Sequence, residues 1–156
     1  MAFLKHTEHF DSINAIAKKI DDKAEALGME NLSQQEQTVE GVWAAVGILE
    51  NGSFQYFFEN DLDIGRVQQA YREIGLPAVA DLFAKAGSLI APLASQPDRQ
   101  TLLKLIQIHE TELDRLAEVI LSFTLEAETK LSEYIRANKE IFSALENKVP
   151  PQTPRL

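Results

Sequence analysis

The stretch Asn51-Gly52-Ser53-Phe54-Gln55-Tyr56-Phe57-Phe58-Glu59-Asn60 decides how this chain folds. It follows an apolar run with helical periodicity. Asn-Gly at that point predicts the end of a helix, because glycine adopts the left-handed conformation at no steric cost. Ser53 can cap a new turn, whose aromatic residues then recur at i, i+3 and i+4 on one face. The sequence therefore predicts a short aromatic plug between two helices, with structural roles for Asn51, Gly52, Phe54, Phe57, Phe58 and Asn60.

Helical periodicity extends over nearly all of the chain, and no alternating strand pattern is present. Ser33 followed by Glu36 forms a capping box, which opens a helix near 33–50. This helix is apolar on both sides, so we expect it to be buried in the middle of a bundle, where Gly41 and Gly47 allow neighbouring helices to approach closely. We predict an all-α fold: a single-domain helical bundle of about six to eight helices over 1–149, with a flexible Pro-rich tail at 150–156.

The segment from Asp98 to Val149 contains neither glycine nor proline. One helix of that length would be unusual in a single domain, so the segment must be interrupted. Thr111 with Asp114 resembles a capping box, and Ser122 or Thr124 could cap another start. We expect one helix break near Thr111 and another near Ser122.

Composition excludes several classes of function. The 156 residues include 24 acidic and 15 basic side chains, a formal charge of −9, which disfavours direct binding of nucleic acid or of an anionic membrane. The chain has no cysteine, so disulfides, thiolate nucleophiles and cysteine-ligated zinc are excluded. The first ten residues lack the apolar core of a signal peptide, and no apolar run approaches the ~20 residues of a membrane span. We expect a cytoplasmic location.

No arrangement of residues indicates catalysis or metal binding. The segment 59–63 alternates oxygen-bearing side chains, but Ile64 stands where a calcium loop needs glycine. His109-Glu110 begins like a zinc-protease helix, but Leu113 occupies the position of the second histidine, so His109 is interpreted as a core residue. Glycine loops that bind phosphate and nucleophile-elbow glycines are both absent. We therefore expect no catalytic residue, no metal and no organic cofactor.

Acidic residues are unevenly distributed along the chain. No basic residue occurs between Lys23 and Arg66. From this window we predict a partner-binding surface for a basic protein, formed by Glu36, Glu40, Glu59, Asp61 and Asp63. A second acidic run contains only Arg115 as a basic residue; it comprises Glu110, Glu112, Asp114, Glu118, Glu126 and Glu128. The alternative interpretation of both runs is a solvated helix face with carboxylates at helix N-termini.

The pattern Asn51-Gly52-x-Phe54-x-x-Phe57-Phe58-x-Asn60 resembles the signature of a bacterial family of uncharacterised domains typified by an acidic DNA-mimic protein. Further similar positions follow in order: Ile74-Gly75 with Ala78, Ala80 and Ala86, then Leu113-Asp114, and then Tyr134-Ile135, Asn138 and Phe142. The resemblance covers about residues 32–143. Ser53 departs from the family pattern, which has a second glycine there, so the turn must be accessible to a non-glycine residue or differ in geometry.

The resemblance implies an acidic, all-helical protein that presents carboxylates in place of DNA phosphates to a DNA-binding protein. An alternative is an immunity- or antitoxin-like protein that neutralises a basic toxin through the same surface, and a third is an enzyme of unknown chemistry. Fold alone does not decide among them. The sequence leaves both a monomer and a homodimer open.

Overall fold

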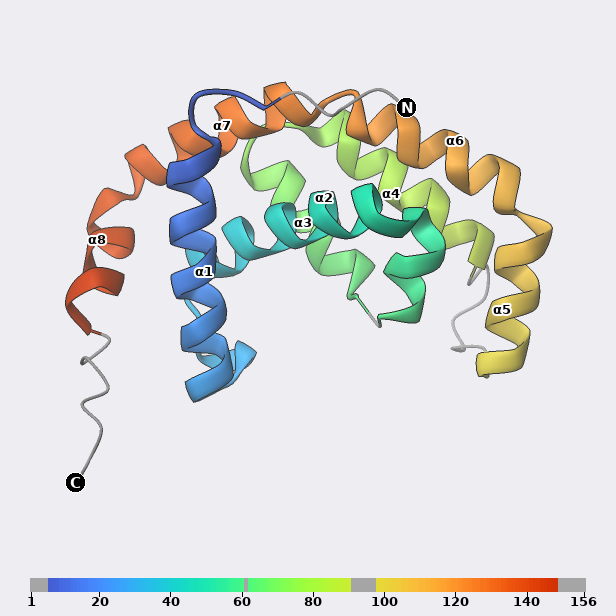
Figure 1. Cartoon of the computed structure of the whole chain (residues 1–156), viewed down its shortest axis with the longest axis horizontal. Helices are drawn as coiled ribbons and strands as arrows, with labels where there is room; N and C mark the ends of the chain where they lie inside the picture. The colour runs from blue at the N-terminus through green and yellow to red at the C-terminus, as the bar shows by residue number, and fades with distance from the viewer. Residues whose placement is uncertain (1–5, 61, 91–97, 149–156) are drawn as a thin grey trace.

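The computed structural model describes residues 6–60, 62–90 and 98–148, with side chains described up to residue 145. Within these ranges the chain forms eight α-helices and one short 3-10 helix and contains no strand, so the predicted all-α bundle is confirmed (Figure 1). The elements are α1 (Phe10–Leu27), η1 (Met29–Asn31), α2 (Gln34–Glu59), α3 (Ile64–Glu73), α4 (Pro77–Ile90), α5 (Arg99–Ile108), α6 (Glu110–Leu121), α7 (Thr124–Ala137) and α8 (Lys139–Lys148). The tail predicted at 150–156 lies outside the described residues.

Helix α2 is the centre of the bundle, as its two apolar sides predicted. It packs against α1, α3, α6, α7 and α8, while α6 and α7 run end to end along one edge (Figure 1). Its first turn has the predicted capping box: Glu36 N donates to Ser33 Oγ at 3.1 Å, and Ser33 N donates to Glu36 Oε1 at 2.8 Å. A Cβ on Gly41 would lie 3.1 Å from Ala70 Cβ, so α3 approaches closely there. At Gly47 nothing lies within 4 Å of that position, and the expected close approach is wrong.

The Asn-Gly pair ends the first helical segment of α2, as predicted, and a second segment follows it across a kink. The second segment continues to Glu59, and between the two segments the backbone departs from helical dihedrals only at Gly52 (φ −164°, ψ 25°) and Ser53 (φ 58°, ψ −162°). The left-handed φ therefore falls on Ser53 and not on the glycine. Position 52 requires glycine for space, because a Cβ there would lie 2.6 Å from Tyr56 Cβ.

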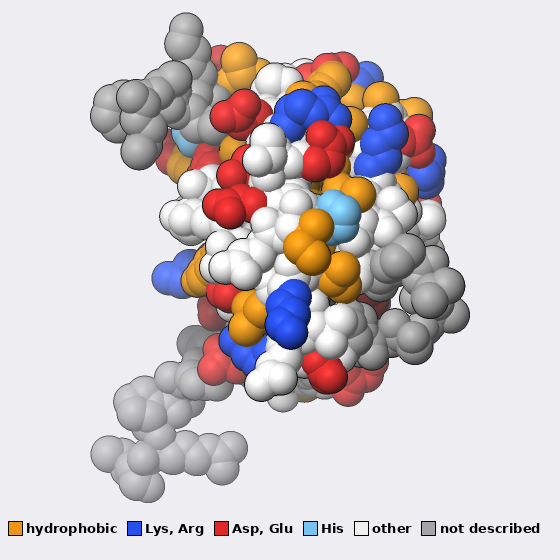
Figure 2. Space-filling model, turned by 90° about the vertical axis from the view of Figure 1, so that its right-hand side faces the viewer, with side chains coloured by type: hydrophobic (Ala, Val, Ile, Leu, Met, Phe, Trp, Pro, Cys, Tyr) orange, Lys and Arg blue, Asp and Glu red, His pale blue; other side chains and the backbone are white. Residues whose placement is uncertain are grey.

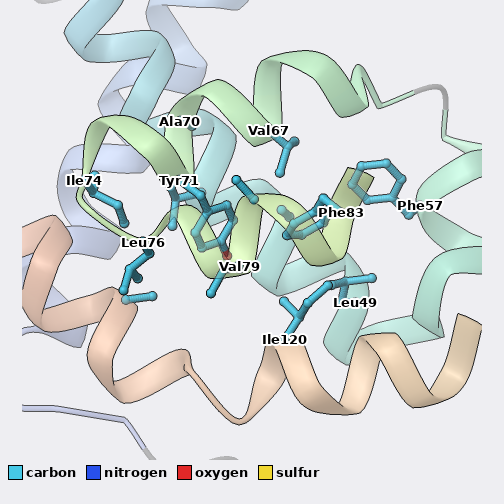
Figure 3. Close-up of a cluster of buried hydrophobic side chains, with 14 of the residues drawn as sticks. Leu49, Phe57, Val67, Ala70, Tyr71, Ile74, Leu76, Val79, Phe83 and Ile120 are labelled. Atoms are coloured by element: carbon cyan, nitrogen blue, oxygen red, sulfur yellow. The ribbon is translucent and has the colours of Figure 1, made fainter. Parts of the chain in front are cut away.

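The aromatic plug is structural, as predicted. Phe54 and Phe57 are fully buried, and Phe58 is half-buried against them. Phe83 of α4 receives the plug, with its ring centroid 5.7 Å from Phe54 and 5.8 Å from Phe57. On its other side Phe83 stacks on Tyr71 of α3 at 5.3 Å (Figure 3). The plug thus joins the second half of α2 to α3 and α4.

The glycine-free C-terminal segment breaks three times. The first break is at His109, two residues before the expected position, so the Thr111–Asp114 pair does not begin a helix. The second falls at Ser122 and Phe123, as predicted. The third, at Asn138, was not predicted; there the Asn138 side chain donates to Tyr134 O and closes α7.

Candidate acidic interface

Glu36 was predicted to face a partner, and the structure corrects this. Its side chain is 2 % exposed, and Lys23 of α1 donates to both carboxylate oxygens at 2.8 and 3.0 Å. Burial alone would raise the pKa of Glu36, but the hydrogen bonds from Lys23 and Ser33 outweigh it and hold the pKa below its ordinary value. A carboxylate that is buried and paired in this way stabilises the α1–α2 contact and presents no charge to a partner.

Glu40 lies one turn further along α2 and is half-buried. Its pKa is raised, first by burial and then by the nearby carboxylate of Asp21, while Arg66 acts in the opposite direction. Glu40 thus lies among groups of both signs contributed by α1 and α3. Its carboxylate is partly accessible and has both an acidic and a basic neighbour.

The remaining predicted carboxylates lie beyond the kink. Glu59 is half-buried in the last turn of α2, and Gln55 donates to it at 3.4 Å. Asp63 is exposed and caps α3, accepting from Arg66 N at 3.1 Å. Asp61 lies outside the described residues. Glu40 and Glu59 are separated by about 28 Å of helical rise, and the kink lies between them. The structure therefore does not gather these residues into one compact patch.

A more regular acidic surface lies on α6. Glu110, Asp114 and Glu118 are all exposed, and their spacing of four residues places them on one side of the helix. The one basic residue of α6, Arg115, is held by Glu112 through Nη2–Oε1 at 2.6 Å and Nε–Oε2 at 3.0 Å. We call Glu110, Asp114 and Glu118 the acidic edge. Their spacing is visible in the sequence, but their common exposure is not.

The acidic edge borders the kink of α2. Ser53 Oγ donates to Asp114 Oδ1 at 2.7 Å, which joins the two helices. Glu50, one turn before Ser53, is also exposed. The residues of the motif that surround the kink are therefore next to the acidic edge, although their own roles are mainly structural.

Glu128, the last member of the second acidic run, is not part of any surface. It is 2 % exposed and accepts three hydrogen bonds, from His6 Nδ1 at 2.6 Å, Thr7 N at 2.7 Å and Thr7 Oγ1 at 2.8 Å. These bonds hold the segment before α1 against α7. Sequence patterns gave no signal for this contact, because the partners are more than a hundred residues apart.

Apolar side chains adjoin the acidic edge. Figure 2 views the end of the molecule that α5 and the start of α6 occupy, and shows hydrophobic side chains gathered among acidic and basic ones. Ile108 is 73 % exposed, two residues before Glu110, and Leu103 is 38 % exposed on the same helix, α5. Only Ile106 of α5 is buried. This end therefore combines carboxylates with accessible apolar surface.

Other kinds of site find little support in the described ranges. No group of three or more potential metal ligands occurs there. A shallow cavity of about 250 Å³ lies at the α7–α8 junction and is lined by residues 136–141. None of the described helices has both the length and the apolar character needed to cross a bilayer.

Comparison with models of protein families gives a match to this chain. A family model described as DMP19-like protein matches residues 30–138, from η1 through α7. No curated protein and no solved structure matches the chain significantly. The matched range includes both the plug and the acidic edge, and leaves α1 and α8 outside.

Proposed function

Because this chain belongs to the DMP19-like protein family, a family of DNA mimics, we propose that it is an acidic binding protein that occupies the DNA-binding surface of a basic protein. The observation that carries the proposal is the acidic edge, three exposed carboxylates at regular spacing with no free cation on their helix. The partner would be a basic protein, and the chain itself would not bind DNA.

The acidic edge carries charge less densely than one DNA strand, because its carboxylates are about 6 Å apart along the helix axis. From Glu110 to Glu118 the helix rises about 12 Å, over which one DNA strand carries about four charges at ~3.4 Å of axis each. The edge supplies three carboxylates over that length. Exposed charges of one sign attract a basic surface and accelerate its association, an effect that salt screens within about 8–10 Å.

The apolar side chains of Leu103 and Ile108 favour a protein partner over a small cation. Protein interfaces combine a buried apolar centre with a polar rim, and an exposed isoleucine beside carboxylates fits that composition. Within the surface predicted from the sequence, Glu40, Glu59 and Asp63 keep accessible carboxylates and form a second candidate set. Glu36 is excluded by its burial.

Immobilised chain incubated with an extract of the source organism tests the proposal. We expect a basic protein to be retained and to be released by duplex DNA as well as by salt. Two variants with equal charge compare the surfaces: Glu110→Gln, Asp114→Asn and Glu118→Gln together, against Glu40→Gln, Glu59→Gln and Asp63→Asn together. Asparagine at 114 keeps an oxygen that accepts from Ser53, so the first variant alters charge and preserves the α2–α6 contact.

We expect the first triple variant to lose retention and to show a weaker dependence of binding on salt, while the second behaves like the parent chain. If only the second variant loses retention of the partner, the interface is the surface predicted from the sequence. A retained protein that DNA does not displace would favour an immunity- or antitoxin-like function instead. Retention of no basic protein at all would overturn the proposal.

A further inference from the structure

Asn51 differs from the other asparagines whose side chains the structure describes. Each of the other four amides is engaged: Asn14 accepts from Trp43 Nε1, Asn31 donates to Leu27 O, Asn60 donates to Tyr56 O, and Asn138 donates to Tyr134 O. The Asn51 side chain is exposed and makes no hydrogen bond to any described residue. Its amide is therefore free to rotate about its side-chain bonds.

The backbone leaves the helix immediately after Asn51, so the local opening that brings the Gly52 nitrogen to the Asn51 side chain costs less than it would inside a regular helix. In a regular helix the next amide nitrogen is held in the ladder of hydrogen bonds, away from the asparagine side chain. Helical dihedrals end after Asn51, because Gly52 has φ −164° and Ser53 has φ 58°. Gly52 also has no Cβ to obstruct approach to its nitrogen.

From this arrangement we propose that Asn51 is a site of spontaneous deamidation. The Gly52 nitrogen, after losing its proton to base, attacks Cγ of Asn51. A new C–N bond closes a five-membered succinimide, the bond from Cγ to the side-chain nitrogen breaks, and ammonia leaves with a proton from solvent. Water then opens either ring carbonyl, giving aspartate or isoaspartate. The net reaction consumes one water and releases one ammonia, with no oxidant or cofactor.

The product changes the surface beside the acidic edge. Both products place a carboxylate next to Glu50 and change the formal charge of the chain from −9 to −10. Isoaspartate also adds a methylene to the main chain immediately before the kink, where Ser53 already has an unfavourable conformation. The modification itself does not depend on the proposed function.

Incubation of the purified full-length chain in mildly alkaline buffer, folded and in urea, tests the proposal by peptide mass mapping. In the folded chain we expect Asn51 to convert while Asn14, Asn31, Asn60 and Asn138 do not. A more acidic species should grow on ion exchange, and isoaspartyl methyltransferase should label the peptide that contains residue 51.

The variant Asn51→Gln is the matched control, because it keeps an amide but forms a six-membered ring far less readily. We expect it to remain a single species on ion exchange. Conversion of Asn51 in urea alone would show that the helix still protects it and would overturn the proposal. Equal conversion of the bonded asparagines in the folded chain would also overturn it, since the free amide would then not select the site.

Discussion

Ser53 Oγ donates a 2.7 Å hydrogen bond to Asp114 Oδ1, and the residue that makes this bond is the one with a positive φ in the kink of α2. The combination φ 58°, ψ −162° is a region that glycine occupies freely and other residues only at a cost. Glycine at this position would relieve the strain but could not make this bond. This chain instead combines a strained backbone with a side-chain bond to α6.

The two contributions can be separated by comparing Ser53→Gly with Ser53→Ala. Both variants lose the hydroxyl, but only glycine relieves the strain. After allowance for the greater freedom of glycine in the unfolded chain, Ser53→Gly should exceed Ser53→Ala in stability by about 1–2 kcal/mol. Urea unfolding of both variants measures the difference. Equal stability of the two would mean that the kink is not strained at residue 53.

The aromatic plug predicts a graded response to truncation. Phe57 is fully buried and its ring lies 5.6 Å from Phe54 and 5.5 Å from Phe58, so Phe57→Ala should lower the free energy of unfolding by about 3–5 kcal/mol. Phe58→Ala is the matched control and should cost less, because Phe58 is only half-buried. Thermal and urea unfolding test the order. A similar small loss in both would contradict the structural role of the plug.

Local chemistry made parts of this fold predictable from the sequence. A cap is decided by residues three positions apart, so Ser33 and Glu36 were sufficient to place the start of α2. The buried face of a helix follows from its periodicity in the same way. The kink was harder, because the sequence shows that a turn occurs at Gly52 and Ser53 but not which residue takes the positive φ.

Long-range packing accounts for what the sequence did not predict. Glu36 belongs to an acidic window, yet Lys23 on another helix buries and neutralises it. Gly41 meets Ala70 whereas Gly47 meets nothing, although the two glycines look alike in the sequence. The acidic edge was visible as a charge run, but its exposure follows from how α6 packs on α2 and α4.

The Lys23–Glu36 pair predicts a loss of stability in acid. The folded-state pKa of Glu36 lies below its ordinary value of 4.5, so its contribution is fully present above that value and is lost as pH falls through the folded pKa. Lys23→Met should cost about 2–3 kcal/mol at neutral pH, since it leaves a buried carboxylate without its counter-ion. Glu36→Gln should lower the free energy of unfolding by less than Lys23→Met does. It should also reduce the loss of stability that the parent chain shows as pH falls. If Glu36→Gln loses stability in acid as steeply as the parent chain, Glu36 is not the group responsible.

Glu40 predicts the opposite dependence on pH. Burial and the carboxylate of Asp21 raise its pKa in the folded chain, so its contribution is present below its ordinary value of 4.5 and is lost as pH rises through the folded pKa. At neutral pH the ionised Glu40 is therefore unfavourable, and Glu40→Gln should stabilise the chain by about 0.5 kcal/mol, the scale of a partly exposed charge interaction. The gain should shrink as pH falls below the folded pKa, where the parent chain is itself neutral at this position. Melting temperatures of the parent, Glu40→Gln and Asp21→Asn across that pH range measure the effect, and Asp21→Asn should recover part of the gain. A Glu40→Gln variant that is less stable at neutral pH would show that attraction to Arg66 outweighs burial and Asp21.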